Sequence, residues 1–409
     1  MNILRNSKPN DGKRPVLVIN QYALPRNKGG GTRHIDLFGR LEKWRPTIVA
    51  TSRNHSTGEV MTADDDRFVF LPSPAYHGNG IARMVGWGVF ATESFLYGLW
   101  PKSAVVVGSS PQLLVPASAL ALARIKRVPF VMEVRDLWPE SIVAYGALQR
   151  GSALHKVLTA LEAWLYRNAE RIIVVTDGWE EHFASLGIDP AKLQVIPNGT
   201  EPKDFIVDAD RETLRREYGI DGTTAIFAGS HGPKDGIPLI LNAAAKLDGI
   251  NFVLIGDGSA KDEAIAEAKA RNLTNVEFRD PIPKSELPRL LRACDVGLHV
   301  VAPLDVFNKG MSPNKLFDYL ASDLPVVTNA RIPLQRVISD DEVGAVVDPD
   351  DIATGITRVL AADQSTRERW RAHAQMLMST KYSRDAASRL LEQLLDEVVA
   401  GVPPRSAKA

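Results

Sequence analysis

Short apolar runs rich in β-branched residues alternate with longer segments of helical period along most of the chain. Runs that are apolar on both faces are typical of buried parallel strands, and helices form the connections between such strands. We predict strands at residues 15–20, 46–52, 104–110, 129–136, 171–177, 224–230, 251–259, 275–280, 296–301 and 324–330.

A stretch rich in Pro, Asn and Gly, LQVIPNGTEPKDF, separates the first five predicted strands from the last five. Two successive strand–helix arrays indicate two doubly wound α/β domains, and 409 residues are too many for one comfortable core. We expect a first Rossmann-like domain over residues 1–196, a hinge over 197–206 and a second Rossmann-like domain over 207–381. Ligands of such sheets bind at the carboxyl ends of the strands, so the site should lie between the domains.

The last segment, SRDAASRLLEQLLDEVV, has the apolar stripe of an amphipathic helix. We expect residues 382–409 to form a helix that crosses back to the first domain and to end in a disordered tail.

The composition excludes several classes of function. Lys and Arg balance Asp and Glu at 49 each, which argues against a nucleic-acid partner. The single cysteine, Cys294, excludes an intrachain disulfide and a cysteine-based metal site, and no H-x-x-x-H or H-E-x-x-H pattern is present. We therefore expect neither a metal nor a cofactor. The first fifteen residues lack the apolar segment of a signal peptide, which predicts a cytoplasmic protein.

Residues 83–102 are apolar and aromatic, but Glu93 interrupts them and they are too short for a membrane span. One interpretation is a helix lying in the membrane interface, with Trp87, Phe90, Phe95 and Trp100 at headgroup depth. The basic start of the chain, with eight Lys or Arg against two Asp in residues 1–40, would assist such peripheral contact with the inner membrane. The alternative is a buried core helix.

The stretch SPNKLFDYLASDLPVV places Lys315 and Asp318 in the first turns of a predicted helix. Ser312 suits the N-cap and Pro313 the first helical position. A helix N-terminus with an added lysine attracts phosphate, and a carboxylate one turn on suits sugar hydroxyls. The alternative is an ordinary surface pair between Lys315 and Asp318.

Charged and glycine-rich segments follow other predicted strands. Gly30 and Gly31 belong to a GGG loop after the first strand, which is either a ligand loop or a flexible turn. After the fourth strand, MEVRDLWPES offers Arg135 as an anion ligand and Asp136 as a hydroxyl acceptor, unless its charges form an ion pair that fixes the strand end.

The turn AGSHGPKDGIP, after the first strand of the second domain, offers Ser230 and Lys234 to a phosphate. His231 in the same turn could titrate near neutrality, although lone histidines are more often structural.

Together these motifs resemble the retaining glycosyltransferases of family 4, which have the GT-B fold of two Rossmann-like domains. The resemblance rests on EVRDLWPES, RIIVVTDG, VIPNG and SPNKLFDYLASDLPVV in that order, and it extends over residues 15–400. Within the family, the chain is most similar to bacterial transferases that assemble O-antigen, capsule and exopolysaccharide.

The resemblance implies a nucleotide-sugar donor held mainly by the second domain and a lipid-linked or other saccharide acceptor held mainly by the first. We expect the donor to be UDP-linked and its sugar to be a deoxy or N-acetylated amino sugar. Arg135, Asp136 and Lys315 would be the catalytic residues. The expected donor-binding residues are Gly30, Gly31, Ser230, Lys234, Ile282, Ser312, Pro313, Asn314, Lys315 and Asp318, of which Asp318 would bind the ribose and Ile282 the base.

The chain departs from the family pattern at three places. Gly310 stands where the E-x7-E motif has its first acid, so the identity of the sugar stays open. Arg135 replaces the usual histidine of the cleft, and Ser230 and Lys234 stand in or beside the positions of a usual Arg and Lys. Two other functions stay open, a UDP-amino-sugar epimerase and a degenerate subunit that only binds a sugar nucleotide. A nicotinamide dehydrogenase is disfavoured because the G-x-G-x-x-G spacing is missing.

Overall fold

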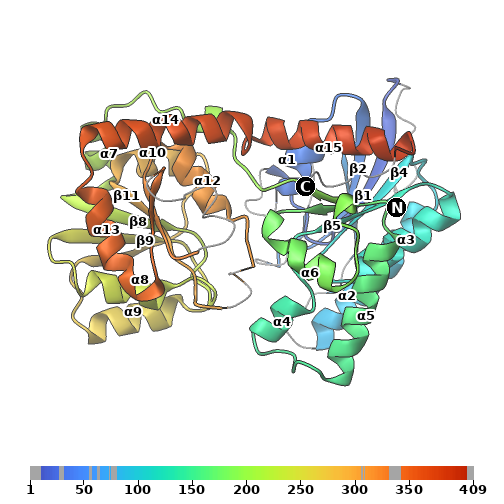
Figure 1. Ribbon diagram of the computed structural model, residues 1–409, viewed down its shortest axis with the longest axis horizontal. Coiled ribbons are helices and arrows are strands. Elements are labelled where there is room, and N and C mark those ends of the chain that lie inside the picture. The colour runs from blue at the N-terminus through green and yellow to red at the C-terminus, as the bar shows by residue number, and fades with distance from the viewer. Residues whose placement is uncertain are drawn as a thin grey trace.

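The structure of the protein is a computed structural model with two α/β domains, each built on one parallel sheet (Figure 1). It describes residues 11–26, 32–54, 58–61, 65–72, 74, 81–304, 307, 309–330 and 342–402. The two sheets confirm the predicted fold class, and every one of the ten predicted runs contains a strand.

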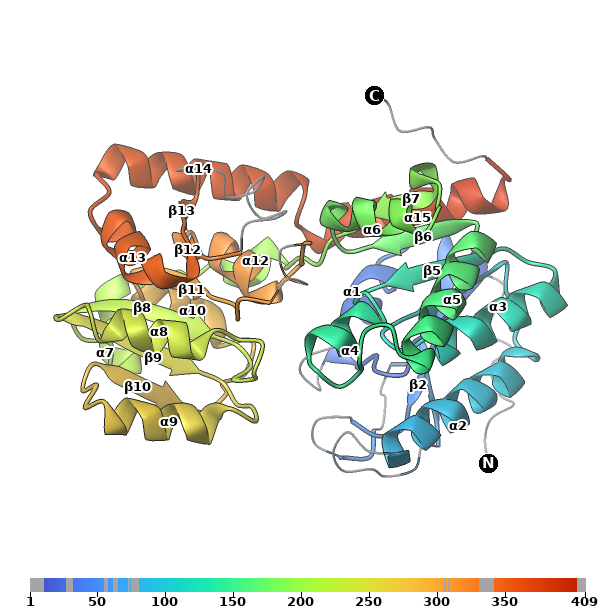
Figure 2. The ribbon, with the colours of Figure 1, turned by 60° about the horizontal axis from the view of Figure 1, so that its bottom comes forward.

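The first sheet has the strand order β3-β2-β1-β4-β5-β6-β7 among the described residues. Helices α2, α3 and α5 lie side by side on one face, while α1 and α15 (Arg384–Val399) lie on the other (Figures 1 and 2). The strands are β1 Arg14–Ile19, β2 Trp44–Thr51, β3 Phe68–Leu71, β4 Val105–Ser109, β5 Phe130–Val134, β6 Arg171–Val174 and β7 Leu193–Val195. The helices are α1 Arg33–Phe38, α2 Ile81–Gly98, α3 Leu114–Lys126, α4 Glu140–Ala144, α5 Ala153–Asn168 and α6 Glu180–Ser185.

The second sheet has the strand order β10-β9-β8-β11-β12-β13 among the described residues. Its strands are β8 Thr223–Ala228, β9 Ile250–Ile255, β10 Val276–Arg279, β11 Val296–His299, β12 Val326–Thr328 and β13 Gly344–Val346. Its helices are α7 Arg211–Tyr218, α8 Ile237–Ala244, α9 Lys261–Ala270, α10 Leu287–Ala293, α12 Asn314–Ala321, α13 Ile352–Leu360 and α14 Gln364–Thr380.

Three strands are missing from the sequence prediction, namely β3, β7 and β13. Each lies at the edge of its sheet and has only three or four residues, so it carries little apolar signal. Residues 193–195, which begin the stretch LQVIPNGTEPKDF before the predicted hinge, pair with β6 as strand β7.

Two segments cross between the domains and lie against each other. The backbone N–H of Thr200 donates to the carbonyl of Tyr382 at 3.2 Å, and Thr200 accepts from the N–H of Arg384 at 3.2 Å. Gly199 makes this approach possible, because a Cβ there would lie 2.2 Å from the carbonyl oxygen of Tyr382. Ser383 then caps α15 by accepting the N–H of Ala386.

Helix α15 (Arg384–Val399) continues the line of α14 and packs on the first domain beside α1 (Figure 1). Its apolar stripe joins the core under β1 and β2. Ion pairs hold its polar edge, since Arg40 bonds Asp385 at 2.7 Å and Lys43 bonds Asp396 at 3.0 Å. The last helix therefore belongs to the first domain in space, although it follows the second in sequence.

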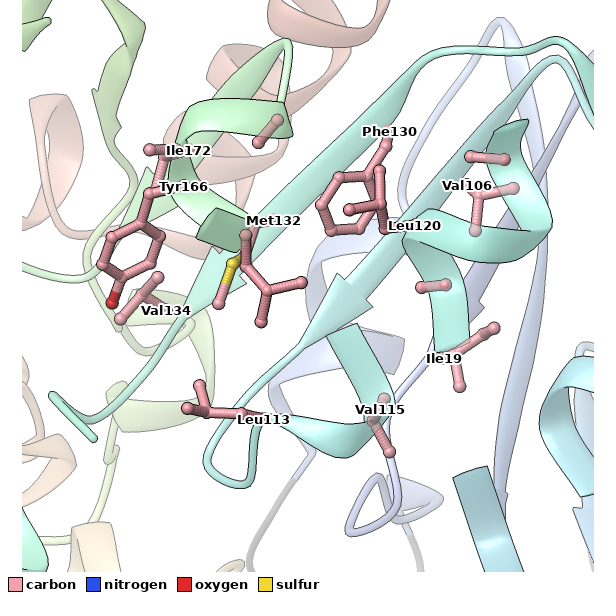
Figure 3. Packing of buried hydrophobic residues seen from close by; sticks show 14 of the residues in the cluster. Ile19, Val106, Leu113, Val115, Leu120, Phe130, Met132, Val134, Tyr166 and Ile172 are labelled. Carbon is pink, nitrogen blue, oxygen red and sulfur yellow. The ribbon is translucent and has the colours of Figure 1, made fainter. Parts of the chain in front are cut away.

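Aliphatic and aromatic side chains of the sheet and its covering helices form the core of the first domain (Figure 3). Val106 of β4, Phe130 and Met132 of β5 and Leu120 of α3 meet in this cluster. Burying such a side chain contributes about 1.5–3 kcal/mol, so this face of the sheet is a large source of stability.

The structure corrects which side chains of residues 83–102 could face a membrane. Phe90 is fully buried in the core, and Phe95 packs against it. Trp87 donates from Nε1 to the hydroxyl of Tyr22 at 2.6 Å and packs edge-on against Trp138. Only Trp100 of the four aromatic residues is largely exposed, at 68%. Among the described helices, none combines the length and apolar character that a membrane crossing requires.

The basic start of the chain is also largely used inside the protein. In the part that the structure describes, Arg14 pairs with Asp396, Arg26 with Asp36, Arg33 with Glu133, and Arg40 with Glu201 and Asp385. These arginines join α1 and α15 to the first sheet, although Arg14 and Arg26 keep 40% and 52% of their side chains exposed. Arg5, Lys8 and Lys28 lie outside the described residues, so a basic face at the start of the chain stays a prediction.

Candidate active site

A cleft of about 870 Å³ lies between the two domains, where the carboxyl ends of the strands face each other. Residues that directly follow β5 form one wall, and residues that follow β8, β9 and β11 form the opposite wall with the start of α12. This is the edge of a doubly wound sheet at which ligands bind.

The start of α12 contributes five of the predicted residues to the cleft, Ser312, Pro313, Asn314, Lys315 and Asp318. The helix begins one residue later than we expected, because Pro313 is its N-cap and Ser312 lies outside it. Ser312 is engaged elsewhere: its hydroxyl oxygen accepts the N–H of Asn198 at 2.8 Å, and its carbonyl accepts from Nδ2 of Asn198 at 2.7 Å.

Lys315 and Asp318 do not pair with each other, so the surface-pair alternative is wrong. The Lys315 side chain is 14% exposed and its ammonium bonds Oδ1 of Asp235 at 2.7 Å. The ammonium also lies 3.9 Å above the ring of Phe227. Burial lowers the pKa of Lys315, while the charge and hydrogen bond of Asp235 oppose this shift.

Asp318 is a buried carboxylate that pairs with Lys284 from the loop after β10. The Asp318 side chain is 6% exposed, whereas that of Lys284 is 52% exposed and reaches over the ring of Phe205. Ile282 lies in the same loop and lines the cleft beside them. The exposed partner leaves Asp318 open to exchange Lys284 for a ligand.

The turn after β8 brings Ser230 and Lys234 into the cleft, where both are exposed. Ser230 donates to Oδ2 of Asp235 at 2.6 Å. His231 is fully buried instead, between the rings of Phe227 and Phe278, and burial lowers its pKa. His231 therefore packs beneath the turn as a neutral side chain.

Arg135 and Asp136 lie on the opposite wall, immediately after β5. The backbone N–H of Arg135 donates to Oγ of Ser110 at 2.8 Å, which fixes the strand end. Asp136 is open to solvent within the cleft, yet the protein around it desolvates its carboxylate and raises its pKa, against the charges of Arg135 and Lys234. The influence of Lys234 shows that the two walls face each other.

Glu133, in the same motif, forms a buried ion pair at the strand end, as the alternative interpretation of this motif predicted. Its carboxylate accepts from Nε of Arg33 at 2.8 Å, Nε2 of His34 at 2.7 Å and Oγ of Ser109 at 2.6 Å, all in the interior. Glu140 also forms an ion pair, with Arg150 at 2.6 Å. The motif thus contains two structural charges beside the two that face the cleft.

The other glycine loop that we proposed falls outside the described residues. Gly30 and Gly31 belong to residues 27–31, so their contact with a ligand stays a prediction.

The structure gives a backbone reason for Gly310. Its φ of 123° is a conformation that glycine alone adopts without strain. Its carbonyl accepts from Nε1 of Trp179 at 3.1 Å. Beside it, a Cβ on Gly178 would lie 2.1 Å from the carbonyl oxygen of Lys309. The loop before α12 therefore rests closely on the first domain at this point.

Sequence reasoning missed four residues of the site, Asp235, Asn198, Lys284 and Trp179. Asn198 connects the two domains, since its Oδ1 accepts from Nη1 of Arg33 at 3.0 Å while it holds Ser312. Asn198 stands in the motif VIPNG and Asp235 in the glycine-rich turn, so both motifs pointed to the right segments. Their partners are distant in sequence, and no local pattern identifies them.

No cluster of three or more His, Cys, Asp or Glu side chains suited to a metal ion occurs in the described ranges. Cys294 is buried, and burial raises the pKa of its thiol to about 12, so it is an unreactive core residue.

Comparison with known protein families agrees with this geometry. Residues 32–199 match the model of the glycosyl transferase 4-like domain, and residues 222–362 match that of the glycosyl transferases group 1. Together the two ranges cover most of both domains. The chain is a GT-B glycosyltransferase.

Individual relatives support the same assignment. The chain is 28% identical over 351 residues to the probable glycosyltransferase WbjE of Pseudomonas aeruginosa, a match that covers 82% of this chain and 86% of that protein. Its fold is similar to that of HepE from Anabaena, solved with UDP and glucose, with a TM-score of 0.70 and 15% identity over 94% of this chain and all of that one.

WaaG, a glycosyltransferase involved in lipopolysaccharide biosynthesis, has a TM-score of 0.64 and 16% identity over 94% of this chain and 99% of its own. These structural likenesses concern the fold.

Proposed function

We propose that this glycosyltransferase transfers a sugar, with retention of configuration as in family 4, from a UDP-sugar to a saccharide acceptor. The observation that carries the proposal is the placement of Lys315 and Asp318. They project one turn apart from α12 into the cleft and face Arg135 and Asp136 of the other domain.

The second domain offers complementary groups to each part of a nucleotide diphosphate. The start of α12 and Lys315 suit the diphosphate, because free N–H groups and a cation stabilise anionic oxygens. The carboxylate of Asp318 suits the two hydroxyls of a ribose, and Ile282 suits the flat face of a base. A UDP complex of HepE, which has the same fold, supports uridine as the base.

The two domains together supply groups for the reaction itself. During same-face displacement the bond between the anomeric carbon and the diphosphate oxygen breaks, so negative charge develops on the diphosphate. The acceptor oxygen bonds to the anomeric carbon on the same face, and its proton passes to the departing diphosphate. Lys315 and Arg135, from opposite walls, stabilise this charge. Asp136 accepts a hydrogen bond from a sugar hydroxyl and orients it. These cations make the reaction independent of an added divalent ion, and transfer in excess EDTA tests this point.

Gly310 bears on the identity of the sugar. A family member with an acid at this position binds sugar hydroxyls with it, whereas here the Gly310 carbonyl is occupied by Trp179. The loss of that carboxylate favours a sugar with fewer hydroxyls to bind, a deoxy or N-acetylated amino sugar. The relation to WaaG supports an acceptor in the biosynthesis of bacterial surface polysaccharide.

The proposed acceptor is lipid-linked, which requires access to a membrane. Exposed apolar side chains on α2, α3, α5 and the turn after α2 are suited to this contact: Met84, Val85, Leu96, Trp100, Ile125, Val157 and Trp164. The helices lie side by side (Figure 2), and Lys102, Arg127 and Lys156 are exposed among them. Apolar insertion together with lysine and arginine, at about 1 kcal/mol each near anionic lipid, supports reversible binding.

Vesicle sedimentation tests this surface. The protein should sediment with anionic vesicles at low salt and dissociate partly as the salt concentration rises. Leu96→Ser with Trp100→Ser should reduce binding at least tenfold without lowering the melting temperature, because both side chains are exposed. Met376→Ser, at an exposed position of α14, is the matched control. Binding that is unchanged by the double substitution rejects the surface, and no binding at all indicates a soluble acceptor.

A thermal-shift screen of UDP, GDP, ADP and their sugars tests the proposed donor. A rise of several degrees with the uridine compounds alone is expected. Transfer from the stabilising sugar to a polyprenyl-linked or free saccharide should follow. Conversion of the nucleotide sugar without acceptor would indicate an epimerase, and stabilisation without any turnover would indicate a binding subunit.

A further inference from the structure

Asp235, in the turn after β8, is a buried carboxylate whose two oxygens are both engaged. Oδ1 accepts from the Lys315 ammonium at 2.7 Å, and Oδ2 accepts from Oγ of Ser230 at 2.6 Å and from the N–H of Gly232 at 3.3 Å. The side chain is only 6% exposed. This set of donors fixes the position of the carboxylate at the wall of the cleft.

Lys315 reaches Asp235 along a path that the backbone keeps open. A Cβ at position 229 would lie 2.8 Å from Cε of Lys315, so Gly229 leaves the space that the aliphatic chain occupies. The ammonium then stands 3.9 Å above the Phe227 ring. A lysine in so little contact with water needs an anionic neighbour to remain charged.

We propose that Asp235 is a positioning residue for glycosyl transfer, which holds Lys315 as a charged donor directed at the diphosphate of the sugar nucleotide. The proposal rests on the function proposed above, in which Lys315 stabilises the leaving group. Asp235 itself has no role in contact with the substrate, because its oxygens already accept from Lys315, Ser230 and Gly232.

The groups around Lys315 differ in sign. Desolvation lowers its pKa, Asp235 raises it by charge and by hydrogen bonding, and Lys234 lowers it. Two histidines are also close enough to interact electrostatically with Lys315, His231 beneath the turn and His299 at the end of β11. Burial lowers the pKa of both, that of His299 to about 3. Because these histidines are neutral at pH 7, Asp235 is the neighbour that favours the ammonium form.

The expected consequence is a change in the basic limb of the pH profile. In the parent, kcat should fall at high pH as Lys315 loses its proton. Removal of the negative charge at position 235 lowers the pKa of Lys315, so the same fall should occur at lower pH.

The test measures kcat and KM for the donor between pH 6 and 10 in the full chain. Asp235→Asn should move the basic limb at least one pH unit toward lower pH, with KM for the donor changed less than threefold. Asp235→Glu should restore the limb. Lys315→Arg should remove it in both backgrounds, because arginine stays charged throughout this range. A parental limb in Asp235→Asn or in Lys315→Arg would overturn the proposal.

A second measurement does not depend on turnover. The rate at which an amine-acylating reagent labels Lys315, followed by mass spectrometry across pH, reports its protonation in the free protein. Half-maximal labelling should shift to lower pH in Asp235→Asn, while exposed Lys156 on α5 should not change. Equal labelling profiles reject the inference even if transfer is observed. A shifted profile in a chain that transfers no sugar rejects the proposed function instead.

Discussion

Glu133 of β5 and Asp235 of the turn after β8 are both buried carboxylates that bind a cation near the carboxyl end of a strand. Glu133 is enclosed by Arg33, His34 and Ser109, and neither Glu133 nor Arg33 lines the cleft. Asp235 and Lys315 line the cleft, and Lys315 keeps 14% of its side chain exposed. The comparison shows that access to the cleft, more than burial or pairing, separates a structural charge from one that can meet a substrate.

Asp318 resembles Asp235 in lining the cleft, but the lysine that it binds is much more exposed. Its partner Lys284 is half-exposed, so water already competes for the pair. Only the lysine of this pair is exposed, so a ligand that donates hydrogen bonds to the buried Asp318 carboxylate can take its place. Glu133 therefore stabilises the first domain, while Asp318 and Lys315 of the second domain line the cleft.

The largest expected effect is on stability. Glu133→Gln should lower the free energy of unfolding by about 3–5 kcal/mol, because it leaves Arg33 buried without its counter-charge. Chemical denaturation measures this change. Glu140→Gln, which breaks the ion pair with the exposed Arg150, is the control and should cost no more than about 1 kcal/mol. Equal losses in the two variants would contradict the distinction between an enclosed and an open pair.

Lys315→Ala should lower kcat about 10²–10³-fold, the range found when one donor to a developing anion is removed. Uridine binding should stay the same, because the nucleoside lacks the diphosphate. Steady-state kinetics and calorimetry give the two values, with Lys156→Ala on the exposed face of α5 as the control. An unchanged kcat in Lys315→Ala would show that this lysine does not stabilise the leaving diphosphate.

Asp318→Ala should raise the Kd for UDP at least tenfold, since hydrogen bonds to a charged group contribute about 1.5–3 kcal/mol. Calorimetry measures the affinity, and the melting temperature confirms that the variant is folded. Asp280→Ala is the control, because its side chain is 94% exposed, pairs with Lys261 and does not line the cleft. Unchanged UDP affinity in folded Asp318→Ala would remove Asp318 from the donor site.

The smallest expected effect is on how steeply the free energy of unfolding changes with pH. Burial by itself would raise the pKa of Glu133, but His34 and Arg33 outweigh it and hold the pKa well below its usual range. A carboxyl with a depressed folded pKa contributes stability that is complete above its unfolded value, about 4.3, and is lost as pH falls through the folded pKa.

Below about pH 4.3, Glu133 should therefore account for up to about 1.4 kcal/mol of lost stability per pH unit. Glu133→Gln should lack this contribution. The free energies of unfolding of the variant and the parent should therefore become more similar as the pH falls. Denaturation at several pH values between 3 and 7 measures both slopes, and parallel slopes would contradict this origin of the pKa shift.

The local pattern of the sequence was sufficient to predict most strands of the fold and the segments that form the cleft. The ten long apolar runs predicted ten strands, since a buried parallel strand is apolar on both faces whatever its neighbours are. The motifs around Arg135, Ser230 and Lys315 identified the walls of the cleft for a similar reason: charges at the end of a buried strand stand at the ligand-binding edge of a doubly wound sheet.

Tertiary structure decided which of these charges face the cleft and what they bind. Asp235 lies 80 residues from Lys315, and Arg33 lies 100 residues from Glu133. The 83–102 segment likewise shows a helical apolar pattern, but only packing against the sheet assigns Phe90 to the core and Trp100 to the surface. Sequence determines the elements because their patterns are local; partners and exposure depend on contacts between distant elements, which no single segment encodes.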